Sequence, residues 1–286
     1  MLLELIASSF LDKDDIESVA IDKQGLEALL RILHCFRNDD STESLPGAAC
    51  RALFHFCKNV TCAKLVVKAR GIDLILKAMK TCPENGCMQN EGACSLLSLC
   101  CRNRNIRYML DNDIYDLLFK QLEVQTRVAG ACYLLERIAR CIPDEVQIIL
   151  EKGVVDACLN ILRKTKPDHV DFMSLHLLRD VCSACSLLAS LAANDAAVKN
   201  MIILKGGIKV IEDTAAAVPD QDYALEDAFS LLGILKNDAL NHCGPYMCKL
   251  LCRTWGAEIF VKGSSSMDSD APYSPSSPTP YSDGDR

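Results

Sequence analysis

One six-residue pattern occurs five times along this chain, and its spacing constrains the fold more than any other feature. It reads Gly-Ala-Cys-Ser-Leu-Leu at 92–97 and Gly-Ala-Cys-Tyr-Leu-Leu at 130–135, with related copies at 48–53, 183–188 and 227–232. If the third residue of each copy is numbered zero, position −1 is always Ala and position +3 is always Leu. Position zero is Cys50, Cys94, Cys132, Cys185 and Phe229, at intervals of 44, 38, 53 and 44 residues. The three positions share one arc of a helix, so each copy predicts a helix that buries this arc against its neighbours.

Two further helical patterns lie between the copies. An amphipathic run follows a glycine at four places, and Asp113 stands where a fifth glycine is expected; the glycines are Gly25, Gly71, Gly153 and Gly207. Glycine before a helical run indicates a tight bend in which φ can be positive. Short apolar segments precede these bends at 64–69, 105–110, 146–152 and 198–204. Each repeat therefore reads as short helix, bend, amphipathic helix, loop and buried helix.

This order of elements resembles the armadillo repeat, a unit of about 40 residues in three helices. The segments "VVKARGIDLILKAM", "NEGACSLLSLC" and "IILEKGVVDACLNIL" carry the resemblance, although HEAT repeats look similar. It implies an all-α fold in which residues 1–262 form a right-handed superhelix of about five armadillo-like repeats. The last helices of the repeats are expected near 48–59, 91–103, 129–141, 180–194 and 225–237.

Three segments depart from the repeat. Residues 164–172 are expected to be an inserted loop, and residues 2–10 read as a last helix without its partners, which leaves open a cap or a fragment of a longer protein. Residues 263–286 are rich in Ser, Pro and Asp and cannot bury a core, so we expect a disordered tail. Its Ser-Pro and Thr-Pro pairs at 274, 277 and 279 suit proline-directed kinases.

Charge and cysteine content narrow the class of protein. The net charge of −7 disfavours nucleic acid as a partner, and no stretch looks long and apolar enough to span a bilayer. The 17 cysteines in a chain of this length, without a secretory signal at its start, indicate reduced thiols. We therefore expect a cytoplasmic or nuclear protein.

Motifs that carry catalysis are absent from the sequence. It contains no P-loop, GxGxxG, GxSxG or HExxH, and few strand signals, so we expect no enzyme and no cofactor. Cys182 and Cys185 form a CxxC, but inside a repeat helix, where packing explains them better than redox chemistry. His242, Cys243, Cys248 and Cys252 are the best metal candidates, but a capping helix with small apolar faces explains them better, so we predict no metal site.

The resemblance also implies where a partner would bind, because the last helix of each armadillo repeat lines a concave groove. At about 100° per residue, positions +1, +5 and +8 lie near 100°, 140° and 80°, away from the buried arc. This rule gives Arg51, His55 and Lys58 in the first copy, then Ser95, Leu99 and Arg102, then Tyr133, Arg137 and Arg140. The later copies present small neutral residues, among them Ser186 and Ser190. A basic groove over 51–140 would attract an acidic or phosphorylated segment, although a merely solvated polar face is the simpler alternative.

One armadillo function is disfavoured by the same positions. Nuclear-import adaptors carry Trp and Asn four residues apart on this helix, whereas this chain has the pairs Arg51/His55, Ser95/Leu99, Tyr133/Arg137 and Ser186/Ser190. We therefore predict a monomeric, non-catalytic scaffold or adaptor whose partner-binding residues are Arg51, His55, Lys58, Arg102, Tyr133, Arg137 and Arg140. The alternatives are a regulatory armadillo domain of a larger signalling or ubiquitin-ligase adaptor protein, a zinc- or thiol-dependent protein, and a groove occupied by the chain's own acidic tail.

Overall fold

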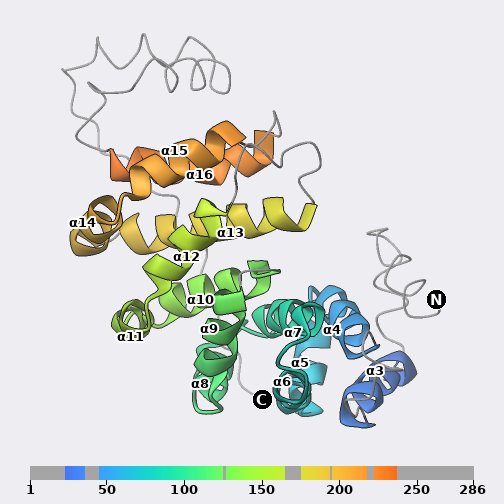
Figure 1. Ribbon diagram of the computed structural model, residues 1–286. Coiled ribbons are helices and arrows are strands. Elements are labelled where there is room, and N and C mark those ends of the chain that lie inside the picture. The colour runs from blue at the N-terminus through green and yellow to red at the C-terminus, as the bar shows by residue number, and fades with distance from the viewer. Residues whose placement is uncertain are drawn as a thin grey trace, which may run out of the picture. The chain divides into compact units, whose positions relative to one another are not determined.

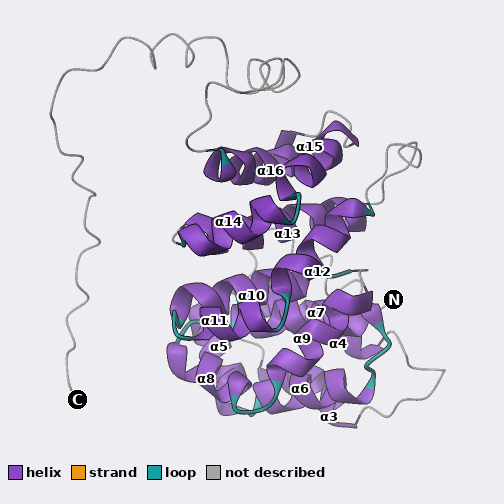
Figure 2. Cartoon of the chain, turned by 60° about the vertical axis from the view of Figure 1, so that its left-hand side comes forward, coloured by secondary structure: helices purple, strands orange, loops and turns teal. Residues whose placement is uncertain are grey.

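The computed structural model describes residues 23–35, 45–124, 127–164, 175–193, 195–217 and 222–236. Within these ranges the chain forms 14 α-helices joined by turns, and no strand (Figures 1 and 2). The expected all-α class is therefore confirmed for the described residues. Three expectations lie outside them: the isolated helix at 2–10, the Cys/His cluster at 242–252 and the tail at 263–286.

The helices follow one another in threes. An incomplete first set consists of α3 (Lys23–Cys35) and α4 (Leu45–Phe56). Four full sets follow: α5 (Val60–Lys68), α6 (Gly71–Thr81) and α7 (Gly86–Ser98); α8 (Asn103–Leu110), α9 (Ile114–Val124) and α10 (Ala129–Cys141); α11 (Glu145–Glu151), α12 (Val154–Arg163) and α13 (Leu175–Ala193); α14 (Ala196–Leu204), α15 (Gly207–Ala217) and α16 (Asp222–Leu235). We refer to α4, α7, α10, α13 and α16 as the third helices.

Corresponding helices of successive sets pack against one another. The third helices form one row, α4 against α7, α7 against α10, α10 against α13 and α13 against α16 (Figure 1). The middle helices form a second row, α3, α6, α9, α12 and α15, and each short helix packs on the middle helix of its own set. All of these helices belong to one compact unit, residues 1–237.

The repeated hexapeptide supplies the contact surface of the third-helix row. Its Ala residues are 0–1% exposed and its position-zero residues 0–5% exposed. Four of the five Leu residues at +3 are fully buried, whereas Leu97 is half-buried. A full burial of Leu contributes roughly 2 kcal/mol, so this arc is a main source of stability between neighbouring sets.

At two of the glycines before the middle helices, φ is not positive as we expected. At Gly71 and Gly207 the left-handed residue is the one before, Arg70 with φ 60° and Gly206 with φ 77°. A Cβ at Gly71 would lie 2.3 Å from Val66 Cγ1, and one at Gly207 would lie 2.5 Å from Ile202 Cγ2. These glycines are therefore needed for close packing of the short helix on the middle helix, and the bend itself is made one residue earlier.

Four of the five third helices begin earlier than the hexapeptide suggested. The largest difference is α7, which spans Gly86–Ser98 where 91–103 was expected. The Asn85 side chain accepts a hydrogen bond from Met88 N at 2.9 Å and so caps the helix before the hexapeptide. At the other end the N–H groups of Leu99 and Cys100 donate to the carbonyls three residues back, which closes a turn. The predicted bounds of α10 agree with the structure, and those of α4, α13 and α16 differ by one to five residues.

Within the described helices, α13 contains a stretch that is long and apolar enough to cross a membrane, His176–Ala193. The expectation that the chain has no such stretch is therefore wrong for this segment. Of that stretch, 61% is buried inside the fold. Its apolar character is accounted for by contacts with α10, α12, α14 and α16, as in the core helix of a soluble protein.

The tightest approach in the third-helix row yields a first prediction. A Cβ at Gly130 would lie 2.5 Å from the backbone O of Asn90 and 3.0 Å from Ala93 Cβ, so α7 and α10 would have to move apart. Gly130→Ala should lower the free energy of unfolding by about 1–3 kcal/mol. Gly233→Ala is the matched control, because Gly233 lies within α16 and its Cβ would meet nothing within 4 Å. Urea unfolding should show the control unchanged or stabilised by up to about 1 kcal/mol; equal effects of the two substitutions would contradict the close approach.

Candidate partner-binding face

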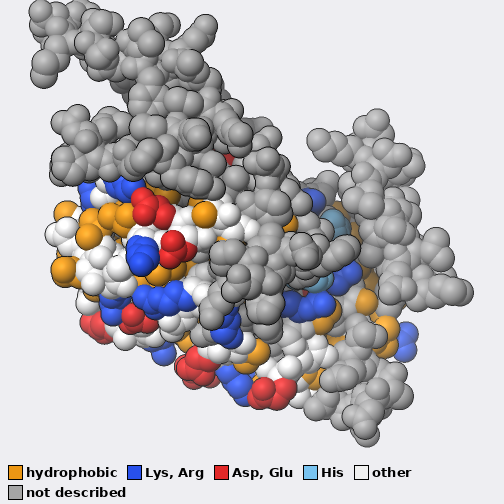
Figure 3. Space-filling view, turned by 45° about the horizontal axis from the view of Figure 1, so that its top comes forward, with side chains coloured by type: hydrophobic (Ala, Val, Ile, Leu, Met, Phe, Trp, Pro, Cys, Tyr) orange, Lys and Arg blue, Asp and Glu red, His pale blue; other side chains and the backbone are white. Residues whose placement is uncertain are grey.

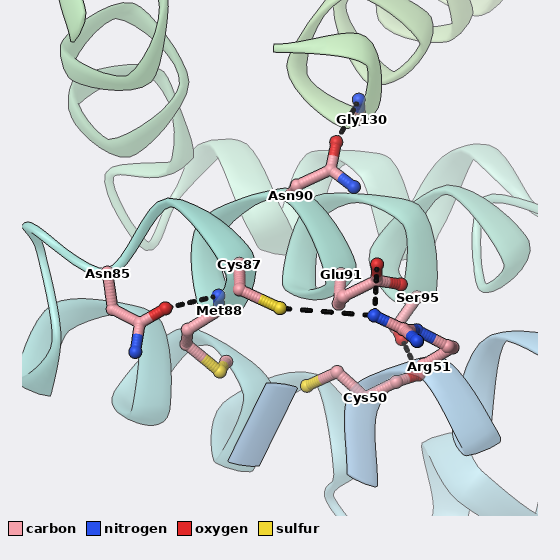
Figure 4. Close-up of polar contacts among 9 residues, drawn as sticks. All are labelled: Cys50, Arg51, Asn85, Cys87, Met88, Asn90, Glu91, Ser95 and Gly130. Atoms are coloured by element: carbon pink, nitrogen blue, oxygen red, sulfur yellow. Dashed lines mark hydrogen bonds and ion pairs between the residues drawn. The ribbon is translucent and has the colours of Figure 1, made fainter. Parts of the chain in front are cut away.

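The first part of the candidate face lies where α4 packs on α7. Arg51 Nη2 donates to Glu91 Oε1 at 3.2 Å and lies 4.0 Å from Cys87 Sγ (Figure 4). The Arg51 side chain remains 45% exposed, whereas that of Glu91 is 11% exposed. Ser95 donates from its hydroxyl to the backbone O of Cys50 beneath them. The exposed guanidinium is thus held in place by an acid of the neighbouring set.

The second part lies on α10 and α13. Ser186 Oγ donates to Glu136 Oε2 at 3.1 Å, and Arg140 Nη1 lies 3.4 Å from Glu136 Oε1. Burial raises the pKa of the Tyr133 phenol to about 12, so this side chain offers a neutral hydroxyl at neutral pH. The pKa of Asp227 is also raised, chiefly by burial and then by Glu136 and Glu226. We call these surfaces together the third-helix face, defined by Arg51, Glu91, Tyr133, Glu136, Arg137, Arg140 and Ser186.

The sequence-predicted binding residues separate into three groups. Arg51, Arg137 and Arg140 are exposed on third helices, and His55 and Tyr133 are half-buried there. Lys58 and Arg102 are exposed but lie in the turns that follow α4 and α7. Their placement on a helical face was wrong, because both helices end before position +8.

Two neutral positions assigned to the groove are buried instead. Ser95 is 1% exposed and Leu99 is 0% exposed. Ser95 faces α4, where its hydroxyl bonds the carbonyl of Cys50, and the Leu99 carbonyl accepts the Asn105 side-chain N–H at 2.8 Å. In this set the helix ends at Ser98, so the angular rule does not apply to Leu99.

The face is less basic than the sequence suggested. Burial, and then Lys58, lower the pKa of His55 from its ordinary value, which favours the neutral imidazole. Glu91, Glu136 and Asp227, which the sequence analysis missed, place carboxyl groups among the arginines. On the face of the molecule drawn in Figure 3, blue Lys and Arg side chains and red Asp and Glu side chains lie near one another at the lower left. The same angular rule would have found these acids, because positions −3, −2 and +4 lie near 60°, 160° and 40° at about 100° per residue.

Three buried polar side chains position the start of α10. The Asp180 carboxyl group on α13 accepts backbone hydrogen bonds from Arg127 N, Val128 N and Ala129 N at 2.9, 2.8 and 2.9 Å. Asn90 Oδ1 on α7 accepts from Gly130 N at 3.0 Å (Figure 4). Gln121 Nε2 on α9 donates to Arg127 O at 2.5 Å. Backbone groups that a helix leaves unpaired at its N-terminus are thereby bonded by both neighbouring third helices.

Asp180 also brings together cations that the sequence analysis did not select. Arg127, with φ 54°, bonds Asp180 through its backbone, and His176 and Arg179 lie on the first turns of α13 beside Asp180. Burial lowers the pKa of His176, and Arg127 and Arg179 lower it further. These two arginines are therefore within electrostatic reach of His176. No local sequence signal links Arg127 to α13, because the bond joins residues 53 apart.

The repeated cysteines are packing residues in this structure. Cys50, Cys94, Cys132 and Cys185 are at most 5% exposed, and burial raises the pKa of Cys94 to about 12. Cys182 is also buried, and its pKa is raised to about 11 mainly by burial. A buried thiol with a raised pKa is a poor nucleophile, which favours the packing interpretation of the CxxC. Among the described residues, no group of three or more His, Cys, Asp or Glu could hold a metal ion.

Comparisons with known proteins address the fold alone. No family model and no curated protein matches the chain. Two crystal structures of engineered proteins from a structural genomics consortium are similar to it. The first has a TM-score of 0.58 at 20% identity, over 93% of this chain and 60% of the engineered one. The second has a TM-score of 0.54 at 18% identity, over 83% and 97% of the respective chains. At such identities the likeness shows a shared helical fold and carries no function.

The buried cap on α10 leads to a second prediction. Asp180→Ala would leave three backbone N–H groups without their acceptor, two of them in buried residues, and should cost about 3 kcal/mol of unfolding free energy. Asp195→Ala is the matched control, since Asp195 caps α14 within its own set and bonds Ala197 N and Val198 N near the surface. Its loss should cost about 1 kcal/mol. If the two substitutions lower the stability equally in thermal unfolding, the hydrogen bonds between α13 and α10 stabilise the fold no more than an ordinary helix cap does.

The cysteine pattern leads to a third prediction. Brief treatment of the folded protein with iodoacetamide should modify the exposed Cys35 and Cys101. Four motif cysteines, Cys50, Cys94, Cys132 and Cys185, are buried. Each should react at least roughly 100-fold more slowly than the exposed pair. Peptide mass mapping before and after denaturation measures both groups in one sample. Rapid modification of Cys94 or Cys132 in the folded protein would show that the row of third helices opens readily.

Proposed function

We propose that this chain is a non-catalytic protein-interaction scaffold or adaptor. In this proposal residues 1–262 form a right-handed armadillo-like superhelix of about five repeats, and an acidic or phosphorylated partner segment lies along the third helices. The observation that carries the proposal is the unbroken packing of α4, α7, α10 and α13, together with the exposed arginines of this row, Arg51 on α4 and Arg137 and Arg140 on α10. Row-like helical stacks bind through the extended surface that the stacking creates.

The charges on the third-helix face suggest what the partner presents. Arg137 has no hydrogen bond or ion pair among the described residues, so its guanidinium is available for a carboxylate or phosphate. Glu136 beside it on α10, and Asp227 on α16 further along the row, would repel an acid at those points. An extended segment with its negative charges opposite Arg51 and Arg137, and a neutral or basic residue opposite Glu136, matches this alternation.

The proposal also covers the kind of partner and the compartment. An overall charge of −7 opposes binding to nucleic acid or to an anionic membrane surface, which favours a protein partner. The 17 cysteines favour a compartment in which thiols stay reduced, so we propose a monomer in the cytoplasm or nucleus. In this proposal the protein binds the partner segment and needs no cofactor.

A charge-reversal experiment tests this function. The triple variant Arg51→Glu, Arg137→Glu and Arg140→Glu should lose partners that wild type captures from a cell lysate, because reversed charges repel an acidic segment. For a single purified partner the affinity should fall by roughly tenfold or more. Quantitative mass spectrometry of the captured proteins gives the readout.

The control must change charge equally without touching the third-helix face. The triple variant Lys68→Glu, Lys77→Glu and Arg104→Glu does so, since these residues are exposed on α5, α6 and α8 and have no ion pair among the described residues. Partners lost from both triple variants would reflect net charge alone. If neither variant loses a partner, the third-helix face is not the binding surface and the proposal fails.

A further inference from the structure

The start of α10 is surrounded by cationic side chains from three different elements. Arg127 directly precedes α10, His176 and Arg179 lie on α13, and Arg51 extends from α4. We call these four residues the cation cluster. The helices concerned pack in series, α4 on α7, α7 on α10 and α10 on α13. Arg51 Nη2 lies 4.0 Å from Cys87 Sγ, and the neighbouring Gly86 lies beside the Arg127 side chain.

Buried bonds hold Arg127 in an unusual conformation. Its φ of 54° is in the left-handed region, which costs a non-glycine residue roughly 1 kcal/mol. Its N–H donates to Asp180 Oδ2 at 2.9 Å and its C=O accepts from Gln121 Nε2 at 2.5 Å. Its side chain runs past the start of α7, where a Cβ on Gly86 would lie 3.9 Å from Arg127 Cδ. The backbone that presents this guanidinium is therefore fixed from both sides.

The positive charges of the cluster come from its three arginines, because the lowered pKa of His176 favours a neutral imidazole. These charges are only partly neutralised. Arg51 is bonded to Glu91, whereas the side chains of Arg127, His176 and Arg179 have no hydrogen bond or ion pair among the residues that the structure describes. Asp180 is 3% exposed and its two oxygens already accept three backbone N–H groups. After burial, the three arginines lower the pKa of His176 and Glu91 raises it. Arg179 also lowers the pKa of Asp180, so its charge is offset in part by that carboxyl group. The free donors at this end thus outnumber the available acceptors.

We propose that the cation cluster binds the phosphate group of a phosphorylated serine or threonine in the partner segment. A phosphate monoester presents three acceptor oxygens and up to two negative charges, so it can bond several guanidinium groups and an imidazole at once. A single carboxylate has two oxygens and one charge and would satisfy fewer of these donors. The proposal rests on the function proposed above and adds to it a defined place, and a defined chemistry, for one residue of the partner.

Binding of defined peptides to the full chain tests the cluster. Three libraries of short peptides, identical except for a central phosphoserine, serine or glutamate, are titrated by fluorescence anisotropy. The phosphoserine library should bind wild type at least about tenfold more tightly than the other two. Arg127→Gln with Arg179→Gln should remove this preference, whereas Arg104→Gln with Arg107→Gln on α8 should change it less than about twofold. Inorganic phosphate should compete for binding, and chloride at equal ionic strength should not.

Several outcomes would overturn the proposal. Equal affinity for the three libraries, or equal losses in the two double variants, would mean that no phosphate site exists here. Thermal melts first show whether each variant is folded. If Arg127→Gln lowers the melting temperature, the single variant Arg179→Gln is used in place of the double variant. If lysate partners depend on Arg137 and Arg140 but the phosphoserine preference is absent, the cluster is wrong and the scaffold function stands. If the preference depends on Arg127 and Arg179 while the charge-reversed face keeps its partners, the chain has a phosphate site, but the third-helix face does not bind the partner and the proposed function fails.

Discussion

The start of α10 lies between two other helices, and this placement imposes the main constraint on the fold. The first N–H groups of a helix have no partner within it, and leaving them unbonded inside the protein costs about 1–3 kcal/mol each. Here Asp180 of α13 and Asn90 of α7 bond the N–H groups of residues 127–130. The same bonds fix the register of three successive sets of helices. They also determine which side chains of α13 lie beside Arg127. The geometry of the candidate site therefore depends on the hydrogen bonds that cap α10.

The sequence predicted the buried arc well because that arc depends on local spacing. Ala131, Cys132 and Leu135 are apolar at helical intervals, and the structure buries all three completely. The bounds of α7 were predicted less well, because its start is determined by the Asn85 cap and the hexapeptide begins six residues after Gly86. The bond from Asp180 to α10 could not be predicted at all. It joins residues more than 50 positions apart, and nothing in the sequence near either residue indicates the other.

The candidate face was predicted in part for the same reason. Arg51 and Arg137 are exposed as the angular rule requires, because both lie well inside straight helices. The prediction for Arg102 was wrong because the rule assumes a continuous helix, whereas α7 has already ended and Arg102 precedes α8. Glu91 was missed because positions before the hexapeptide were not projected, although α7 begins early enough to place it on the same side.

The pairing of Arg51 with Glu91 changes how such a face can recognise a partner. The exposed Arg51 guanidinium attracts an acidic segment, but less than an unpaired arginine would, since a carboxylate already lies 3.2 Å from it and neutralises part of its charge. More can be gained at Arg127, Arg137 and Arg179, whose side chains have no bonded acid among the described residues. Glu136, next to Arg137 on α10, repels a negative charge of the partner that lies opposite it. Attraction at fixed points combined with repulsion between them selects the register of a partner segment rather than its total charge, which is how alternating charges produce specificity.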